Sequence, residues 1–368
     1  MPSRKGTIRL NKRKIHILAA CGCVLLGLVI MAVATFTIIR AIGRKNMTTP
    51  IAGTGEGPIE IGEAVNTEAD DEPLEEGIII YKGLKYRPNE DIITILVMGI
   101  DYTLVNDIEG YMRKDDAGEF DGGQADALFL VLLNPHTQAV NVVGINRNTM
   151  ADVDVFDEAG NYMGRYKEQI CLQHGYGDGG TVSCERQVRT VSRFFKGIPI
   201  NSYASLSMDA IPVLNDAVGG VTVEVLDDII QPKYGVDFRQ GQTVTLMGED
   251  AYWYLKYRDI KIFDSASLRL QRQKQYITLF GAKAKQAIKS DIRVAGDLYN
   301  LVQQYMTTDM DITSYTYLAS ESSDYSFSAD NVFTLKGETV MGEKFEEFYP
   351  DEEALEDLII ELYYEPVN

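Results

Sequence analysis

Residues 122–149 of this chain, GGQADALFLVLLNPHTQAVNVVGINRNT, decide its fold. Two apolar runs, at 127–133 and 138–145, flank the turn-forming sequence NPHT at 134–137. Asn-Pro opens turns, and both flanks are rich in β-branched and large apolar residues, so the stretch predicts a β-hairpin. The first run is apolar at nearly every position, which indicates burial on both faces of a sheet.

Two charged residues bracket this hairpin. Asp126 lies ten residues before His136 and Arg147 lies eleven after it, so antiparallel pairing brings both to the same open end. Charged groups at the end of buried strands need partners. The sequence leaves two interpretations open: a structural ion pair, or part of a functional site.

Strand-like and helix-like segments alternate along the chain on both sides of the hairpin. The segments expected as strands are 92–100, 151–157 and 198–207. The segments expected as helices are 182–195, 208–220, 248–259 and 267–289. This alternation predicts an α/β domain in which a mixed central sheet is covered by helices.

The N-terminal part has a different character. Residues 17–39 contain no charge and are long enough to span a bilayer. Six basic residues precede this segment and three follow it, which places the N-terminus in the cytoplasm and the bulk of the chain outside the cell membrane. A cleaved signal peptide is the alternative, although no clean small-residue cleavage site follows.

These patterns predict five consecutive parts. They are a cytoplasmic tail at 1–15, a single transmembrane helix at 16–40, a flexible acidic linker at 41–76, an extracytoplasmic domain at 77–290 and a C-terminal α/β extension at 291–368.

Composition excludes some functions. The chain has 35 basic and 54 acidic residues, and nine of the basic but none of the acidic residues fall within the first 45. The rest is therefore strongly acidic, so we expect no nucleic-acid partner. The chain has three histidines and lacks G-x-S-x-G, H-E-x-x-H and P-loop motifs, which argues against a histidine-based hydrolase.

Two of the four cysteines, Cys171 and Cys184, lie outside the apolar N-terminal segment. An oxidising exterior makes a disulfide between them possible, and two free thiols are the alternative. A zinc site is not expected, because only His174 is near and no second ligand pair has the required spacing.

A pair of aspartates is the first candidate for chemistry. Asp101 follows the predicted strand 92–100, and Asp126 precedes the first strand of the hairpin. If these strands are neighbours, the carboxylates converge and suit Mg²⁺, which prefers few protein ligands plus substrate phosphate. Aspartate at a strand end without any metal role is the alternative.

A basic cluster is the second candidate. Lys256 and Arg258 end one predicted helix, and Arg269, Arg272 and Gln273 lie on the next. Arg269 and Arg272 are spaced i, i+3 and so share a helix face. Guanidinium groups bind phosphate or pyrophosphate bidentately. Salt bridges to the acidic surface are the alternative.

Taken in order, these pieces resemble the LytR-CpsA-Psr family of Gram-positive bacteria over roughly residues 90–285. The resemblance rests on Gly99-Ile100-Asp101, the hairpin from Asp126 to Arg147, LNDAVGGVTV at 214–223, G-x-x-A-x-x-Y-x-x-x-R ending at Arg258, and R-x-x-R-Q at 269–273.

The resemblance implies a phosphotransferase that moves a glycopolymer from a polyprenyl-pyrophosphate carrier to peptidoglycan, with a hydrophobic pocket for the lipid tail. It implies Mg²⁺ as cofactor and matches its ligands to Asp101 and Asp126, which together with Arg147 are the expected catalytic residues. The residues expected to bind the substrate pyrophosphate are Arg147, Lys256, Arg258, Arg269, Arg272 and Gln273.

The chain departs from the family pattern at several positions. Asn148 replaces the aspartate of Arg-Asp-Thr, Cys171 stands where a basic residue is common, and Lys256 replaces an arginine. An aspartate common before R-x-x-R-Q is Ala266, with Asp264 the nearest carboxylate. These departures leave an alternative function open, a catalytically weak or inactive protein that binds polyprenyl phosphate or wall polymer on the same fold.

Overall fold

The computed structural model describes residues 31, 33–55, 61, 77–101, 113–114, 120–121, 123–157, 159–291, 293–321 and 324–367. Its centre is a six-stranded sheet with the order β15-β10-β3-β6-β7-β16. In that order the strands are Met306–Thr308, Ser202–Ser207, Ile93–Ile100, Ala125–Asn134, Ala139–Ile145 and Val332–Thr334. The β10–β3 and β7–β16 pairs are parallel and the other three are antiparallel, so the predicted mixed sheet is confirmed.

The predicted hairpin is formed by β6 and β7. Asn134 pairs with Ala139 at the closed end, and the Asn134 side chain accepts hydrogen bonds from the backbone N–H groups of His136 (2.9 Å) and Thr137 (3.1 Å). The asparagine thus caps the turn with its own carbonyl oxygen.

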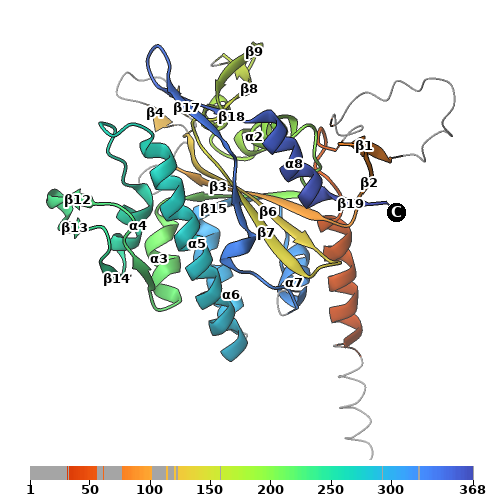
Figure 1. The fold of residues 1–368 in the computed structure, drawn as a ribbon. Coiled ribbons are helices and arrows are strands. Elements are labelled where there is room, and N and C mark those ends of the chain that lie inside the picture. Colours follow the sequence, from red (N-terminus) through yellow and green to blue (C-terminus); the bar gives the residue numbers. More distant parts are fainter. Residues whose placement is uncertain are drawn as a thin grey trace, which may run out of the picture.

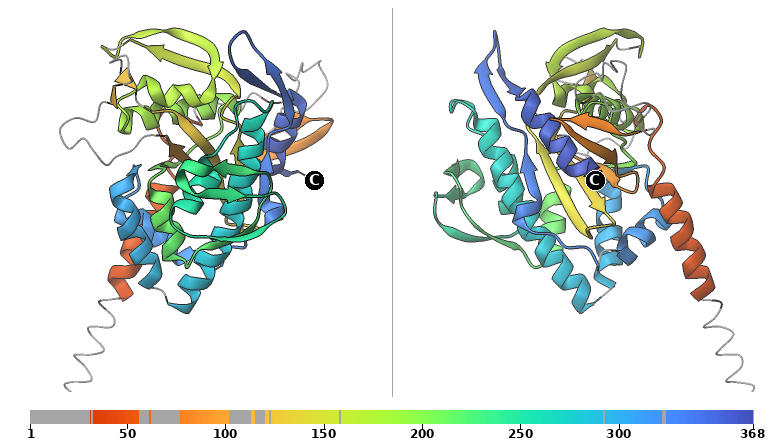
Figure 2. Two further views of the ribbon diagram at one scale, coloured as in Figure 1. Left: turned by 90° about the vertical axis from the view of Figure 1, so that its left-hand side faces the viewer. Right: turned by 45° about the vertical axis from the view of Figure 1, so that its right-hand side comes forward.

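Helices cover both faces of the sheet, giving three layers (Figures 1 and 2). The helices are α2 (Thr181–Phe194), α3 (Ala210–Ala217), α4 (Glu249–Lys256), α5 (Ser265–Ser290), α6 (Arg293–Val302), α7 (Ile312–Glu321) and α8 (Glu352–Tyr363). Short 3-10 helices lie at Ile170–Tyr176, Pro232–Tyr234, Gln303–Tyr305 and Ala329–Asn331.

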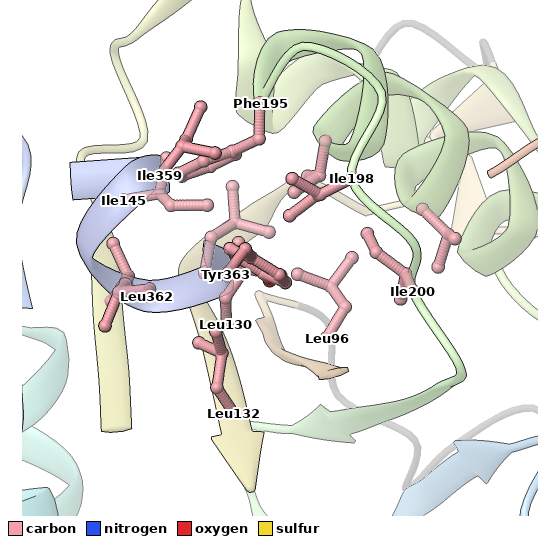
Figure 3. Close-up of a cluster of buried hydrophobic side chains, with 14 of the residues drawn as sticks. Leu96, Leu130, Leu132, Ile145, Phe195, Ile198, Ile200, Ile359, Leu362 and Tyr363 are labelled. Carbon is pink, nitrogen blue, oxygen red and sulfur yellow. The ribbon is translucent and has the colours of Figure 1, made fainter. Parts of the chain in front are cut away.

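The two faces of β6 pack into different layers. Leu128, Leu130 and Leu132 join the main core with α2 and α8, part of which is drawn in Figure 3. Phe129 on the opposite face packs against Leu270 of α5. Burial on both faces, predicted from the apolar run, is therefore confirmed.

Smaller sheets surround the centre. They are β1–β2–β19 (Ile79–Tyr81, Leu84–Pro88, Tyr364–Pro366), β8–β9 (Met150–Phe156, Tyr162–Gln169), β11–β14 (Val221–Glu224, Thr243–Leu246), β12–β13 (Ile229–Gln231, Val236–Phe238), β17–β18 (Gly337–Met341, Glu346–Pro350) and β4–β5 (Arg113–Lys114, Phe120–Asp121). The β8–β9 and β17–β18 hairpins project from the end of the molecule opposite the helix at 33–47 (Figure 1).

The segment predicted as a linker is partly ordered. Residues 33–47 are helical, and this helix comes so close to α7 that a Cβ on Gly43 would lie 2.0 Å from the Thr313 carbonyl oxygen. Met47 is buried against Ile93 and Tyr317, and Ile51 N donates to Ile200 O (2.8 Å). Residues 41–55 are therefore packed on the domain, in contrast to the flexible linker expected at 41–76.

Residues 291–367, expected as a C-terminal α/β extension packed on or following the domain, share its central sheet and its core. β15 and β16 form the two edges of the central sheet, and α8 contributes Tyr363 to the main core. Tyr363 OH is hydrogen-bonded to Thr94 Oγ1 of β3 at 3.0 Å. Residues 291–367 thus complete the α/β domain.

Most of the predicted transmembrane helix at 16–40 lies outside the described residues. Among the residues that are described, no helix combines the length and the apolarity needed to cross a bilayer.

Candidate functional site

A β-bulge places the first site residue. Ala127 pairs with Gly99 and Ala125 pairs with Ile100, so Asp126 is an extra residue of β6 opposite β3. A bulge turns its side chain out of the regular alternation and is common beside active sites. The Asp126 carboxylate is thereby directed at the open end of the β6–β7 hairpin.

Two arginines hold this carboxylate. Arg147 Nε lies 2.9 Å from Asp126 Oδ1, an ion pair without hydrogen-bond alignment, and Arg269 Nη1 donates to Asp126 Oδ2 at 3.0 Å. All three side chains are at most 13% exposed. Burial alone would raise the pKa of Asp126, but the charges of Arg269 and Arg147 outweigh it and hold that pKa below its usual range. The predicted meeting of Asp126 and Arg147 is confirmed, and α5 adds Arg269.

Asp101 forms a second ion pair on the neighbouring strand. Its Oδ1 lies 2.7 Å from Lys256 Nζ at the end of α4, and the same ammonium donates to Tyr252 OH at 2.7 Å. Asp101 N also donates to Gln124 O (3.2 Å), which ties the end of β3 to the start of β6. Both carboxylates therefore lie at the same end of adjacent strands, as predicted.

Arg258 has a different environment from the other basic residues. It is half-buried, and no hydrogen bond or ion pair joins it to any residue in the described part of the chain. Burial, and then the positive charges of Arg269 and Arg147, lower the pKa of Arg258. The carboxylates of Glu346 and Asp126 oppose this shift. Three guanidinium groups thus share a region with two carboxylates, and the excess positive charge there favours an anion.

An apolar cavity of about 200 Å³ adjoins this region. It lies between the sheet and helices α3 and α5, and its lining includes Gly99, Ala127, Phe129, Met208, Ile277 and Phe280. Gly99 and Ala127 are close in sequence to Asp101 and Asp126, and Gln273, one helical turn beyond Arg269, also lines the cavity. The charged residues of the site and the apolar cavity are therefore adjacent.

We call Arg147, Arg258 and Arg269 the arginine cluster. Arg272, which the sequence also predicted to bind pyrophosphate, is not part of it. Its side chain is 1% exposed, pairs with Asp227 (3.2 Å) and donates to the Tyr257 carbonyl oxygen. Burial lowers the pKa of Arg272. Its contact with Tyr257 supports the backbone directly before Arg258, so the structure gives it a positioning role.

The two cysteines are free and buried, so the disulfide considered for Cys171 and Cys184 is not formed. Arg147 Nη2 donates to Cys171 Sγ at 3.1 Å. Burial raises the pKa of the Cys171 thiol although Arg147 opposes this shift, so the sulfur is a neutral acceptor. Cys184 Sγ lies 3.9 Å from His174 Nε2.

Two further departures from the family pattern have structural partners. Asn148 is buried, its Oδ1 accepts from Gln169 Nε2 (3.2 Å), and its carbonyl accepts from Phe348 N (2.9 Å). Asp264 Oδ1 accepts from Thr339 Oγ1 at 2.7 Å. Both residues attach the β17–β18 hairpin beside the site.

Sequence reasoning missed two contacts of the site. Gln124 accepts a hydrogen bond from Arg147, and Tyr252 bonds Lys256. Gln124 stands two residues before Asp126 and Tyr252 one helical turn before Lys256, spacings that indicate proximity but not contact.

Known proteins resemble this chain in sequence and in fold. The model of the LytR_cpsA_psr family matches residues 61–362. Two relatives named polyisoprenyl-teichoic acid–peptidoglycan teichoic acid transferase TagU are similar: that of Halalkalibacterium halodurans is 27% identical over 67% of this chain and 69% of its own, and that of Bacillus subtilis is 26% identical over 74% and 78%.

Solved structures share the fold. Bacillus subtilis TagV has a TM-score of 0.55 at 24% identity and matches 74% of this chain and 95% of its own. A structure described as TagT bound to LIIa-WTA has a TM-score of 0.53 at 21% identity and matches 74% of this chain and 89% of its own. Both have the mixed α/β architecture described above.

Proposed function

This chain belongs to the LytR-CpsA-Psr family, and from that premise we propose that it is a membrane-anchored phosphotransferase. It moves a glycopolymer from a polyprenyl-pyrophosphate carrier to peptidoglycan. The names of the relatives support the reaction, since they describe transfer of a polyisoprenyl-linked teichoic acid to peptidoglycan. The apolar segment at 16–40 anchors the chain, with the N-terminus in the cytoplasm and the domain outside.

The observation that carries this proposal is Arg258. It lies within the electrostatic field of Arg147 and Arg269. Leu255, which is close to it in sequence, and Gln273 on the neighbouring helix both line the apolar cavity. The charges of Glu346 and Asp126 act on Arg258, but no hydrogen bond or ion pair joins it to another residue in the described part of the chain. Burying a guanidinium group without an anion is unfavourable. A pyrophosphate attached to an apolar tail satisfies both features together, because the phosphates neutralise the arginines and the tail fills the cavity.

The site residues have separate roles in the proposed phosphoryl transfer. The acceptor hydroxyl oxygen bonds the phosphorus next to the glycopolymer, the P–O–P bond of the pyrophosphate breaks, and polyprenyl phosphate leaves. Arg147, Arg258 and Arg269 stabilise the negative charge that develops on the two phosphates in this step. Asp126 fixes Arg147 and Arg269, so these two groups need no reorganisation when the substrate arrives. Gln273 lies where the phosphates meet the lipid.

We further propose that Asp101 and Asp126 hold Mg²⁺. Two carboxylates on adjacent strands fit this ion, which usually takes one or two carboxylates and completes its shell with water and substrate phosphate. No group of three acidic, histidine or cysteine side chains suited to a metal occurs among the described residues. Water and substrate phosphate would complete the shell of an ion held by these two carboxylates. Bound Mg²⁺ would neutralise charge on the phosphates. An ionised carboxylate has about four lone-pair sites, so Asp101 and Asp126 would bind the ion and keep their ion pairs with Lys256, Arg147 and Arg269.

The test uses the full chain in detergent or nanodiscs, a lipid-linked oligosaccharide as donor, peptidoglycan fragments as acceptor, and Mg²⁺. We expect transfer by the wild type and a loss on the order of 100-fold in Arg258→Gln, the cost of removing one transition-state charge contact. Arg293→Gln is the matched control, because Arg293 is 83% exposed on α6.

Equal transfer by Arg258→Gln and the wild type would refute the assignment of the site. If the wild type binds the donor but transfers nothing, with or without Mg²⁺, the transferase function is refuted. The protein is then a non-catalytic protein that binds polyprenyl phosphate or wall polymer on the same fold.

A further inference from the structure

Three aromatic rings lie in a row beside the site. Tyr234 stacks on Trp253 with ring centroids 4.4 Å apart and planes at 30°, and Tyr252 meets Trp253 edge to face at 5.3 Å. Tyr234 is 52% exposed, on the β12–β13 hairpin that lies next to α4 (Figure 1). We call Tyr234, Trp253 and Tyr252 the aromatic platform.

The inner end of the aromatic platform is joined to the site. Tyr252 OH accepts from Lys256 Nζ (2.7 Å), and the same ammonium lies 2.7 Å from Asp101 Oδ1. The row of rings therefore leads outward from Asp101 to the half-exposed ring of Tyr234. Anything bound along it extends from the reacting centre toward solvent.

The aromatic platform is separate from the apolar cavity. Leu255 of α4 lines that cavity, whereas none of the three rings is part of its lining. A lipid tail in the cavity thus leaves the platform uncovered. The arginine cluster, which the proposed function assigns to the donor pyrophosphate, is also distinct from these three rings.

We propose that the aromatic platform binds pyranose rings of the acceptor glycan, an assignment that rests on the proposed function. The C–H faces of a pyranose stack on aromatic rings, and rigid Tyr and Trp side chains supply large contact areas at low entropic cost. A polymeric acceptor carries rings beyond the reacting hydroxyl, and binding those remote rings helps to hold that hydroxyl near Asp101.

The acceptor is the occupant that fits this position. The donor is delivered on a lipid, whereas the acceptor approaches from the solvent, where the ring of Tyr234 is exposed. Lys233 Nζ lies 5.1 Å from the centroid of the Tyr234 ring and is placed to contact hydroxyl or carboxylate groups on a bound glycan.

Trp253 is the single tryptophan of the chain, so its fluorescence reports directly on the aromatic platform. The full chain is titrated with soluble, uncrosslinked peptidoglycan fragments in the absence of donor. We expect a saturable change in emission with the wild type, retention of that change in Tyr234→Phe, which keeps the ring, and about tenfold weaker binding in Tyr234→Leu.

A steady-state transfer assay adds a second readout. Tyr234→Leu should raise KM for the acceptor by about the same factor and leave KM for the donor unchanged. Emission that responds only to the lipid-linked donor would overturn the proposal in favour of a donor site, and emission that responds to neither glycan would overturn it outright.

Failure of the proposed function gives a different result. In that case the wild type shows no transfer, whether or not the glycan fragments change the emission of Trp253.

Discussion

Arg147 donates a hydrogen bond to Cys171, and the Nη2–Sγ distance is 3.1 Å. The neutral thiol adds no charge beside the three guanidinium groups and supplies a weak acceptor instead. Cys171 therefore helps to fix Arg147, which also pairs with Asp126.

Replacing this thiol tests its role. Cys171→Val should lower the free energy of unfolding by about 1–2 kcal/mol, because it leaves a buried charged donor without that acceptor. Cys171→Ser keeps an acceptor of similar size and should stay close to the wild type. Urea denaturation measures both, and a Val variant as stable as the Ser variant would show that the contact contributes nothing.

Asp126 gives a prediction about pH. Its folded-state pKa lies below the unfolded value of about 3.9, so it stabilises the fold above that value and the contribution is lost as pH falls through the folded pKa. Asp126→Asn should lower the free energy of unfolding by about 3 kcal/mol at neutral pH, because two buried arginines lose their carboxylate. On acidification, the free energy of unfolding should fall less for this variant than for the wild type.

Urea midpoints measured from neutral to acidic pH check this expectation. Asp237→Asn is the control, since Asp237 is 62% exposed and its pairing with Arg239 contributes little. Parallel pH profiles for the wild type and Asp126→Asn would contradict the prediction.

Arg258 should show opposite effects on stability and on binding. Arg258→Met removes repulsion from Arg147 and Arg269 and keeps an apolar stem, so the free energy of unfolding should rise by about 1 kcal/mol. Binding of inorganic pyrophosphate should weaken at the same time. Calorimetry measures both quantities, and a variant that is less stable than the wild type would show that Arg258 has a stabilising partner.

The apolar cavity can be tested separately from the arginines. Ala127→Leu places a larger side chain in the cavity wall directly after Asp126. It should weaken binding of a long polyprenyl pyrophosphate at least tenfold, because each buried methylene contributes about 0.8 kcal/mol. Inorganic pyrophosphate should bind as it does to the wild type, and an equal loss for both ligands would indicate general damage to the site.

The local parts of this site could be predicted from the sequence. Asp126 and Arg147 are nearly symmetric about the turn, so antiparallel pairing alone brings them together. The position of Arg269 beside Asp126 depends on how α5 crosses the sheet, which no local sequence pattern encodes. Arg269 was assigned to the site from the family resemblance. The bulge at Asp126 left no signal in the apolar run.

Helix periodicity did not predict that Arg272 and Arg269 have different environments. Residues spaced i, i+3 share a helix face but differ in direction by about 60°. On α5 that angle separates two environments: Arg269 reaches Asp126, whereas Arg272 is enclosed by Asp227 and Tyr257. Only the packing of α4 and β11 against α5 decides between them.

The bond between Thr94 and Tyr363 also dictates an order of events during synthesis. Its two partners are separated by 269 positions in the chain, and α8 covers, together with α2, one face of β3 and β6. A chain synthesised only as far as α5 holds part of that apolar face exposed until α8 arrives. Folding therefore finishes only after residues 352–363 have been synthesised, and chaperones that bind exposed apolar surface have that interval in which to act.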